Sequence, residues 1–271
     1  MKSLLLCAGN LTLVLVGLTQ ASSAQTAGEW QLTFSTINHL LDNNDNFSKD
    51  NRFICFDTRE TLGGGIGNST SIGKVSVTSG LENLIYAPWE VIVGTTGSAP
   101  GLGAASYSPL SDEVIFIHGP LVSDTARLGF YATTNRRAGV VLADGSGDIR
   151  FLDMRDVTSA VTTPGAHRGG THRHEWTIDG RRVGFTYDDF LMTTYGRTIG
   201  MMVPHASAPA GVSHYTVLLV PVVPSASAQV GQLDRASDDS WIGSKGLMRG
   251  FIGRVKQADG TSKSEVDTMD C

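Results

Sequence analysis

Residues 176–185 read Trp-Thr-Ile-Asp-Gly-Arg-Arg-Val-Gly-Phe, and this stretch decides the fold. The pair Asp179-Gly180 is typical of a tight turn between two β-strands. After the turn, Val183 and Phe185 are separated by one residue, which is the spacing of a strand with one buried face. The stretch therefore predicts a β-hairpin.

The hairpin pattern recurs along the chain. Each copy has an aromatic residue, a small hydroxyl residue, a polar turn, and an apolar strand that ends in Phe nine positions after the aromatic. The copies are residues 47–56, 107–116 and 176–185, with a degenerate fourth copy at 241–251 that has one inserted residue. Such self-similarity is typical of repeated supersecondary units. The linking stretches add strands at residues 73–77, 90–93, 149–154 and 215–223. Groups of about four strands predict β-propeller blades, and a β-sandwich with similar hairpins is the alternative.

The start of the chain predicts export. Lys2 precedes an apolar run over residues 4–18, and small residues for cleavage end at Ala24. This pattern is typical of a secretory signal peptide. We expect residues 1–24 to be the signal peptide, residues 25–271 to be a single β-propeller domain, and the protein to be periplasmic or secreted.

Composition limits the classes of partner. Without Lys2 the chain carries 20 basic and 26 acidic side chains, so it lacks the basic surface that nucleic acid requires. No later segment has the roughly 20 apolar residues of a membrane-spanning helix. Cys55 and Cys271 are too few for a disulfide framework, and we expect Cys55 to be buried in the core. With 32 glycines and few charges, the chain reads as all-β.

The repeats carry a resemblance to known propellers. The aromatic-Ser-Pro-Asp-Gly type of hairpin is similar to the repeat of TolB-like β-propellers. Residues 30–34, 47–59, 116–120 and 168–174 resemble an uncharacterised family of exported TolB-like proteins. The resemblance implies an all-β, TolB-like β-propeller with WD40-like hairpin repeats. Repeats spaced by 60 and 69 residues leave room for about four blades, so we expect an incomplete ring with an open edge strand.

A more distant resemblance, through His172-Arg173-His174, is to oligogalacturonide lyase propellers. Those enzymes hold a divalent metal on histidines and cleave acidic oligosaccharides by elimination. The Gln that they place three residues before the pair is Gly169 here.

The histidines form the candidate metal site. In a regular strand His172 and His174 point to the same side, where two imidazoles can chelate a metal. His167, across a double glycine, or His39 is the expected third ligand. In the first repeat copy Asp45 stands at the position that matches His174, and it would favour Mn over Zn. The alternative is a hairpin whose imidazoles make only hydrogen bonds.

The remaining site residues follow from the lyase hypothesis. Arg168 or Arg173 would hold the carboxylate of an acidic substrate, and His118 would act as the base. The competing hypothesis is a non-catalytic propeller that binds an envelope protein or a glycan in the periplasm, because fold alone does not choose a function. Self-association through the open edge strand is a further expectation.

Overall fold

The computed structural model describes residues 28–61, 65–157, 161–243 and 246–271. Residues 33–271 form one compact unit. Its described residues form four antiparallel sheets that follow one another along the chain. The strands are β1 (Phe53–Asp57), β2 (Ile72–Ser76) and β3 (Glu82–Tyr86); β4 (Leu102–Tyr107), β5 (Glu113–His118), β6 (Arg137–Leu142) and β7 (Arg150–Phe151); β8 (Gly170–Trp176), β9 (Val183–Asp188), β10 (Thr198–Pro204) and β11 (His214–Leu218); β12 (Leu233–Ile242), β13 (Met248–Lys256) and β14 (Ser262–Asp270). The helices are short: η1 (Ile66–Asn68), η2 (Val122–Asp124), α1 (Thr125–Leu128) and η3 (Ser225–Ser227).

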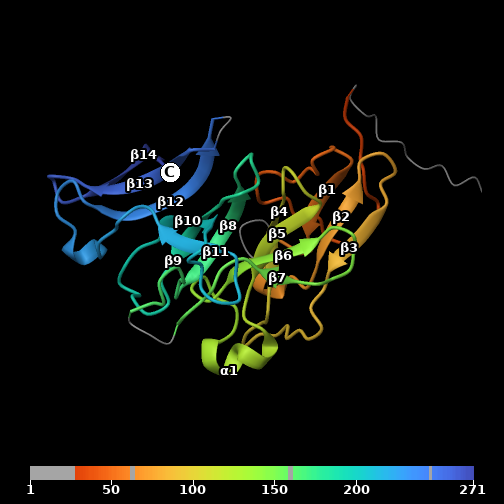
Figure 1. Ribbon diagram of the computed structural model, residues 1–271, viewed down its shortest axis with the longest axis horizontal. Helices are drawn as coiled ribbons and strands as arrows, with labels where there is room; N and C mark the ends of the chain where they lie inside the picture. The colour runs from red at the N-terminus through yellow and green to blue at the C-terminus, as the bar shows by residue number, and fades with distance from the viewer. Residues whose placement is uncertain (1–27, 62–64, 158–160, 244–245) are drawn as a thin grey trace, which may run out of the picture. The chain divides into compact units, whose positions relative to one another are not determined.

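The sheets are arranged as propeller blades. Within each sheet the strands are ordered as they occur in the sequence, and each sheet contacts the next through its early strands, such as β4 with β8 and β9 with β12. In Figure 1 the first sheet (β1–β3) and the fourth sheet (β12–β14) lie on opposite sides of the second and third sheets. The predicted all-β propeller architecture with about four blades is confirmed. The β-sandwich alternative, which has two facing sheets, is wrong.

The repeated hairpins position the core. In the second, third and fourth copies the turn joins the first and second strands of a blade, whereas in the first copy it joins Phe47, which forms an isolated bridge with Ile54, to β1. The phenylalanines that end the copies, Phe56, Phe116, Phe185 and Phe251, are all buried. Burial of each such side chain contributes about 1.5–3 kcal/mol, so the repeat contributes directly to stability.

A left-handed residue interrupts the first strand of the second, third and fourth blades, and in the first blade such a residue lies ahead of β1. Asp45, Ala104, Arg173 and Asp238 have φ values of 56°, 51°, 54° and 56°. In the second, third and fourth blades the strand pairing shifts by one residue at this point. Such a β-bulge reverses the alternation of side chains beyond it. The faces of the first strands therefore differ from those of a regular strand.

The outermost strand of the fourth blade is β14, which pairs along its length with β13 and is exposed at nearly every position. It is an exposed edge strand, and the open edge of an incomplete ring stays a prediction. Cys55 is fully buried, as expected, and both Cys55 and Cys271 are free thiols. Among the described helices, none is long and apolar enough to cross a membrane. The predicted signal peptide lies outside the described residues.

Candidate functional site

The histidine strand β8 differs from the prediction. His172 is paired with Thr186 of β9, and its Nδ1 donates a hydrogen bond to Thr186 Oγ1 at 3.0 Å, so these side chains share one face. His174 contacts Thr171 instead, with 2.9 Å between Nε2 and Oγ1. Thr171 directly precedes His172 and points to the opposite face. The prediction that His172 and His174 share a face is wrong, because the bulge at Arg173 reverses the strand.

His167 and His39 do not complete a metal site either. His167 Nδ1 donates to Gly169 O, and its Nε2 lies 3.2 Å from Asp153 Oδ2. His39 lies in the first blade, 3.1 Å from Glu82. Among the described residues, no three His, Cys, Asp or Glu side chains are grouped closely enough to hold a metal ion. The structure therefore does not bring the predicted Mn or Zn ligands together in the described part of the chain.

Asp45 belongs to residues 42–46, a segment that bonds to the first strands of the second, third and fourth blades and that we call the axial segment. Asn43 Nδ2 donates to the backbone oxygens of Ala104 and His174, at 3.2 and 2.8 Å. Asn44 Nδ2 donates to Glu175 and to Ser240 in the third and fourth blades. Burial, and then the nearby Glu175, raise the pKa of Asp45. The axial segment thus links the blades rather than lining an open cavity with ligands.

His118 is buried at the end of β5, in the second blade. Its Nδ1 donates to Gly119 O at 2.6 Å, and Tyr86 Oη donates to its Nε2 at 3.0 Å. Burial lowers the pKa of His118 to about 4. Both ring nitrogens are engaged and the side chain is fully enclosed, so His118 lacks the free nitrogen and access to substrate that the predicted base requires.

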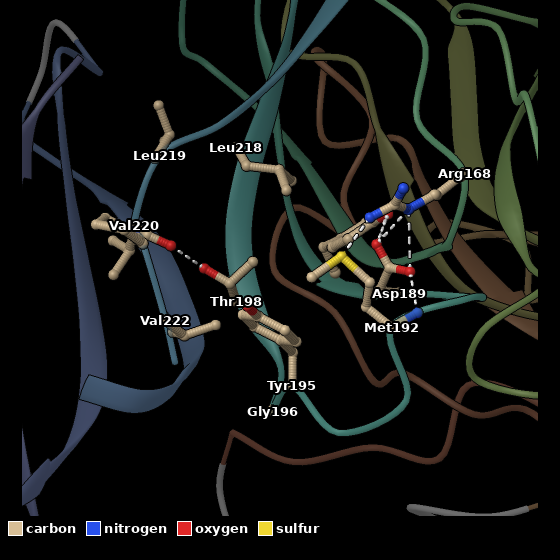
Figure 2. A pocket seen from close by; sticks show the side chains of 12 residues that line it. Arg168, Asp189, Met192, Tyr195, Gly196, Thr198, Leu218, Leu219, Val220 and Val222 are labelled. Atoms are coloured by element: carbon tan, nitrogen blue, oxygen red, sulfur yellow. Dashed lines mark hydrogen bonds and ion pairs between the residues drawn. The ribbon is translucent and has the colours of Figure 1, made fainter. Parts of the chain in front are cut away.

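Arg168 lines a pocket of about 350 Å³ beside the third blade (Figure 2). Its Nε donates to both oxygens of Asp189, at 3.1 and 2.8 Å. Asp189 also accepts hydrogen bonds from Tyr187 Oη and from the backbone N–H of Met192. The opposite wall is aliphatic, formed by residues 218–222. Because Arg168 is already paired with Asp189, a substrate carboxylate would have to compete with Asp189 for the guanidinium group.

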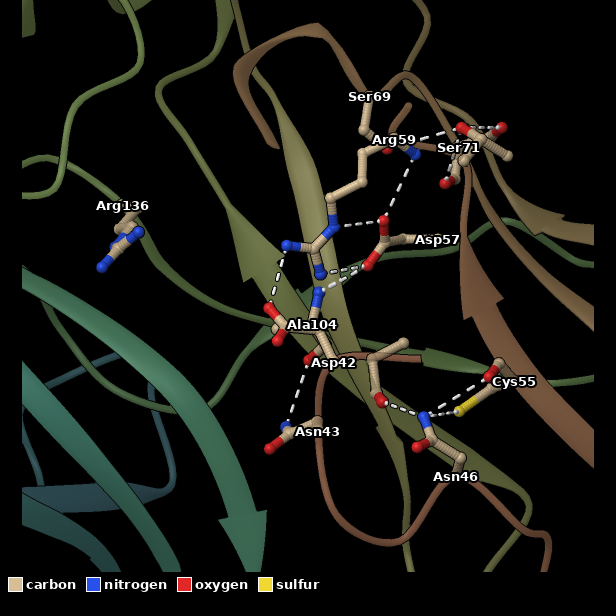
Figure 3. Close-up of polar contacts among 12 residues, drawn as sticks. Asp42, Asn43, Asn46, Cys55, Asp57, Arg59, Ser69, Ser71, Ala104 and Arg136 are labelled. Atoms are coloured by element: carbon tan, nitrogen blue, oxygen red, sulfur yellow. Dashed lines mark hydrogen bonds and ion pairs between the residues drawn. The ribbon is translucent and has the colours of Figure 1, made fainter. Parts of the chain in front are cut away.

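Arg136 is the site residue that the prediction missed. Three arginines are buried: Arg59, Arg136 and Arg249. Arg59 pairs with Asp57 and Asp42, and Arg249 pairs with Asp239. Arg136 has no carboxylate partner in the described chain, and the undescribed residues contain no Asp or Glu. Figure 3 shows its guanidinium group apart from the Asp42–Arg59–Asp57 cluster.

The surroundings of Arg136 place it beside the histidine strand. Thr171 N donates to Arg136 O at 3.0 Å, on the side of β8 that is not paired with β9. Arg136 Nη1 donates to Tyr131 Oη at 2.9 Å, whereas its buried Nε has no partner in the described residues. Burial, and then Arg136, lower the pKa of His172. Burial lowers the pKa of His174 to about 3, and Arg136 also contributes to this decrease.

His172 is the accessible member of this site. Thr186 Oγ1 donates to His172 O at 3.3 Å and accepts from Nδ1, which fixes the proton on Nδ1. The lowered pKa leaves Nε2 unprotonated near neutral pH, and no described residue bonds to it. Arg173 follows in the left-handed conformation and, in the described chain, makes no ion pair. Among the described residues, the axial site, Arg136 with His172, therefore combines a cation without a carboxylate partner with an unprotonated ring nitrogen.

Comparisons with known proteins find a family match and a relative of similar sequence. Residues 101–215 match a family described as "Protein of unknown function (DUF3748)". The chain is 28% identical over 249 residues to the uncharacterized protein YidR of Escherichia coli K12, which covers 87% of this chain and 56% of the relative. The chain therefore spans little more than half of that relative.

Two solved structures are similar at 11% identity. They are a putative TolB from Agrobacterium tumefaciens, with a TM-score of 0.39, and an oligogalacturonate lyase in complex with manganese, with a TM-score of 0.44. The aligned regions cover 84% and 80% of this chain, and 58% and 50% of the respective structures.

Proposed function

We propose that the chain is an exported, non-catalytic propeller module that binds an acidic oligosaccharide through the axial site. The observation that carries the proposal is the buried guanidinium group of Arg136, which has no carboxylate partner among the described residues. A buried charge without a partner is costly, and a ligand carboxylate would remove that cost. The planar fork of Arg matches the two oxygens of a carboxylate, as in a uronate.

The neighbouring side chains support an anionic ligand. His172 is approached by the positive charges of Arg136, Arg197 and Arg173. Arg197 is paired with Asp188 at 2.8 Å, whereas Arg136 and Arg173 are not paired in the described residues. The local excess of positive charge favours an acidic glycan over a neutral one. The chain as a whole carries a net negative charge, so this excess of positive charge is local to the axial site.

Calorimetric titration with oligogalacturonate tests the proposal. Arg136→Gln removes the charge, and we expect the affinity to fall by roughly tenfold or more, because a hydrogen bond to a charged group contributes about 1.5–3 kcal/mol. Arg181→Gln is the matched control, since Arg181 is exposed in the turn of the third blade. Equal affinities for wild type and Arg136→Gln would contradict binding at the axial site.

A second candidate function is β-elimination, favoured by the free Nε2 of His172. The nitrogen would take the proton next to the uronate carboxylate while Arg136 holds that carboxylate. The electron pair then forms a carbon–carbon double bond, the glycosidic C–O bond breaks, and the leaving oxygen takes up a proton. An unsaturated product detected by its ultraviolet absorbance, and lost in His172→Gln, would establish the enzyme. Ligand binding without product would favour the binding module.

Export is part of the proposal. Cleavage after Ala24 would release a chain that begins with Gln25. Mass spectrometry of the periplasmic or secreted protein tests this, and an intact Met1 on soluble protein would contradict it.

A further inference from the structure

A second group of arginines lies at the end of the second blade, away from the axial site. Arg137 begins β6 and is paired with His118, the last residue of β5. Arg155 follows β7 and forms an isolated bridge with His167. We call Arg137 and Arg155 the arginine pair. Burial lowers the pKa of His118, and both arginines lower it further, so all three side chains share one region.

Both guanidinium groups are held in place by uncharged partners. The guanidinium group of Arg137 lies over the ring of Phe151, with Cζ 3.7 Å from the centroid, and its Nη2 donates to Asp153 O at 2.6 Å. Arg155 Nη1 donates to Asn135 O. A guanidinium group has five N–H donors, so most donors of the pair remain available. Arg137 Nε is buried without a partner in the described chain.

Within the described chain the arginine pair has no bonded counter-ion, although the charges of Asp153 and Asp124 act on both arginines from a longer distance. Neither Arg137 nor Arg155 has a carboxylate oxygen within 4 Å in the described chain, and the undescribed residues include no Asp or Glu. The exposed Arg127 adds a third positive charge nearby, although it pairs with Asp124 at 3.4 Å. Burial, and then Arg137 and Arg127, lower the pKa of Arg155 to about 10. Mutual repulsion therefore persists in the folded protein.

We propose that the arginine pair binds a tetrahedral oxyanion, a phosphate or sulfate group. Two guanidinium groups with fixed orientations offer more donors than one carboxylate accepts, whereas a phosphate presents three acceptor oxygens and a charge near −2. Stacking on Phe151 keeps the fork of Arg137 oriented before the ligand arrives. The partners of this site differ from those of the axial site, where Arg136 bonds to Tyr131. The two proposals are therefore independent.

Calorimetric titration of the full chain with inorganic phosphate, inorganic sulfate and a sugar phosphate at low ionic strength tests the proposal. We expect Arg137→Gln and Arg155→Gln each to weaken phosphate binding by roughly tenfold or more. Arg155→Lys retains the charge but loses the fork, so binding should be intermediate. Tighter binding of the sugar phosphate than of the free ion identifies an ester as the ligand, and the reverse identifies the ion itself.

Matched variants decide where the anion binds. Arg181→Gln removes an exposed arginine and should bind phosphate like wild type. Thermal unfolding with and without phosphate checks that each variant is folded. No phosphate or sulfate binding by wild type would overturn the proposal, as would equal affinities in wild type and both glutamine variants. Loss of phosphate binding in Arg136→Gln alone would place the anion at the axial site and also overturn it. Failure of oligogalacturonate binding would leave the phosphate result unchanged.

Discussion

Burial of His118 makes the stability of the protein depend on pH. The pKa of this imidazole falls from 6.5 to about 4 on folding, because the side chain is fully enclosed. Between these values the unfolded state binds a proton that the folded state does not. The free energy of unfolding therefore decreases as the pH falls from 6.5 to 4. One pKa unit corresponds to about 1.4 kcal/mol, so His118 accounts for a loss of about 3 kcal/mol.

The assay is urea denaturation followed by tryptophan fluorescence at several pH values from 7 to 4. Between pH 7 and pH 4, we expect the free energy of unfolding of His118→Gln to decrease by about 3 kcal/mol less than that of the wild type. This difference does not depend on the stability of the variant at pH 7. His205→Gln, a change at an exposed histidine, should keep the wild-type pH dependence. His174, whose pKa is lowered to about 3, contributes a decrease of the same sign that both variants retain. An unchanged pH dependence in His118→Gln would refute the reasoning.

Three further changes test the packing. Arg249→Met leaves Asp239 buried without its partner and should cost about 3–5 kcal/mol in chemical denaturation, whereas Arg52→Met breaks an exposed pair and should cost less than about 1 kcal/mol. Gly170→Ala would bring Cβ within 1.9 Å of Thr133 O and should cost about 2 kcal/mol or more in thermal unfolding, with Gly94→Ala as the tolerated control; equal stabilities would contradict the close approach. Val266→Lys on the exposed β14 should reduce any concentration-dependent association seen in sedimentation, and association that persists unchanged would assign it to another surface.

The fold was predictable because its signals are local. The turn at Asp179-Gly180 and the aromatic-to-Phe spacing lie within ten residues, and the same spacing marks the other blades. The faces of β8 were not predictable, because Arg173 adopts a left-handed φ that a non-glycine residue rarely takes. A single inserted residue was enough to separate His172 from His174.

The axial site depends on distant contacts. Burial alone does not distinguish Arg136 from Arg59 or Arg249, which are also buried. Arg59 finds Asp57 two residues away, but Arg249 also lies 3.5 Å from Glu175, from a different blade. Whether an arginine is compensated is therefore known only once the blades are assembled. The adjacent pair Arg136-Arg137 was the available signal, because paired arginines suit a carboxylate.

The axial segment has a consequence for the order of events during synthesis. Asn44 leaves the ribosome early, but its partner Ser240 follows 196 residues later. At typical elongation rates of about 5–20 residues per second, this interval lasts on the order of 10–40 seconds. During that time the asparagine amides are hydrated, while the hairpins behind them already have their local partners. The axial segment is synthesised first, but its hydrogen bond to the fourth blade forms only after that blade has been made.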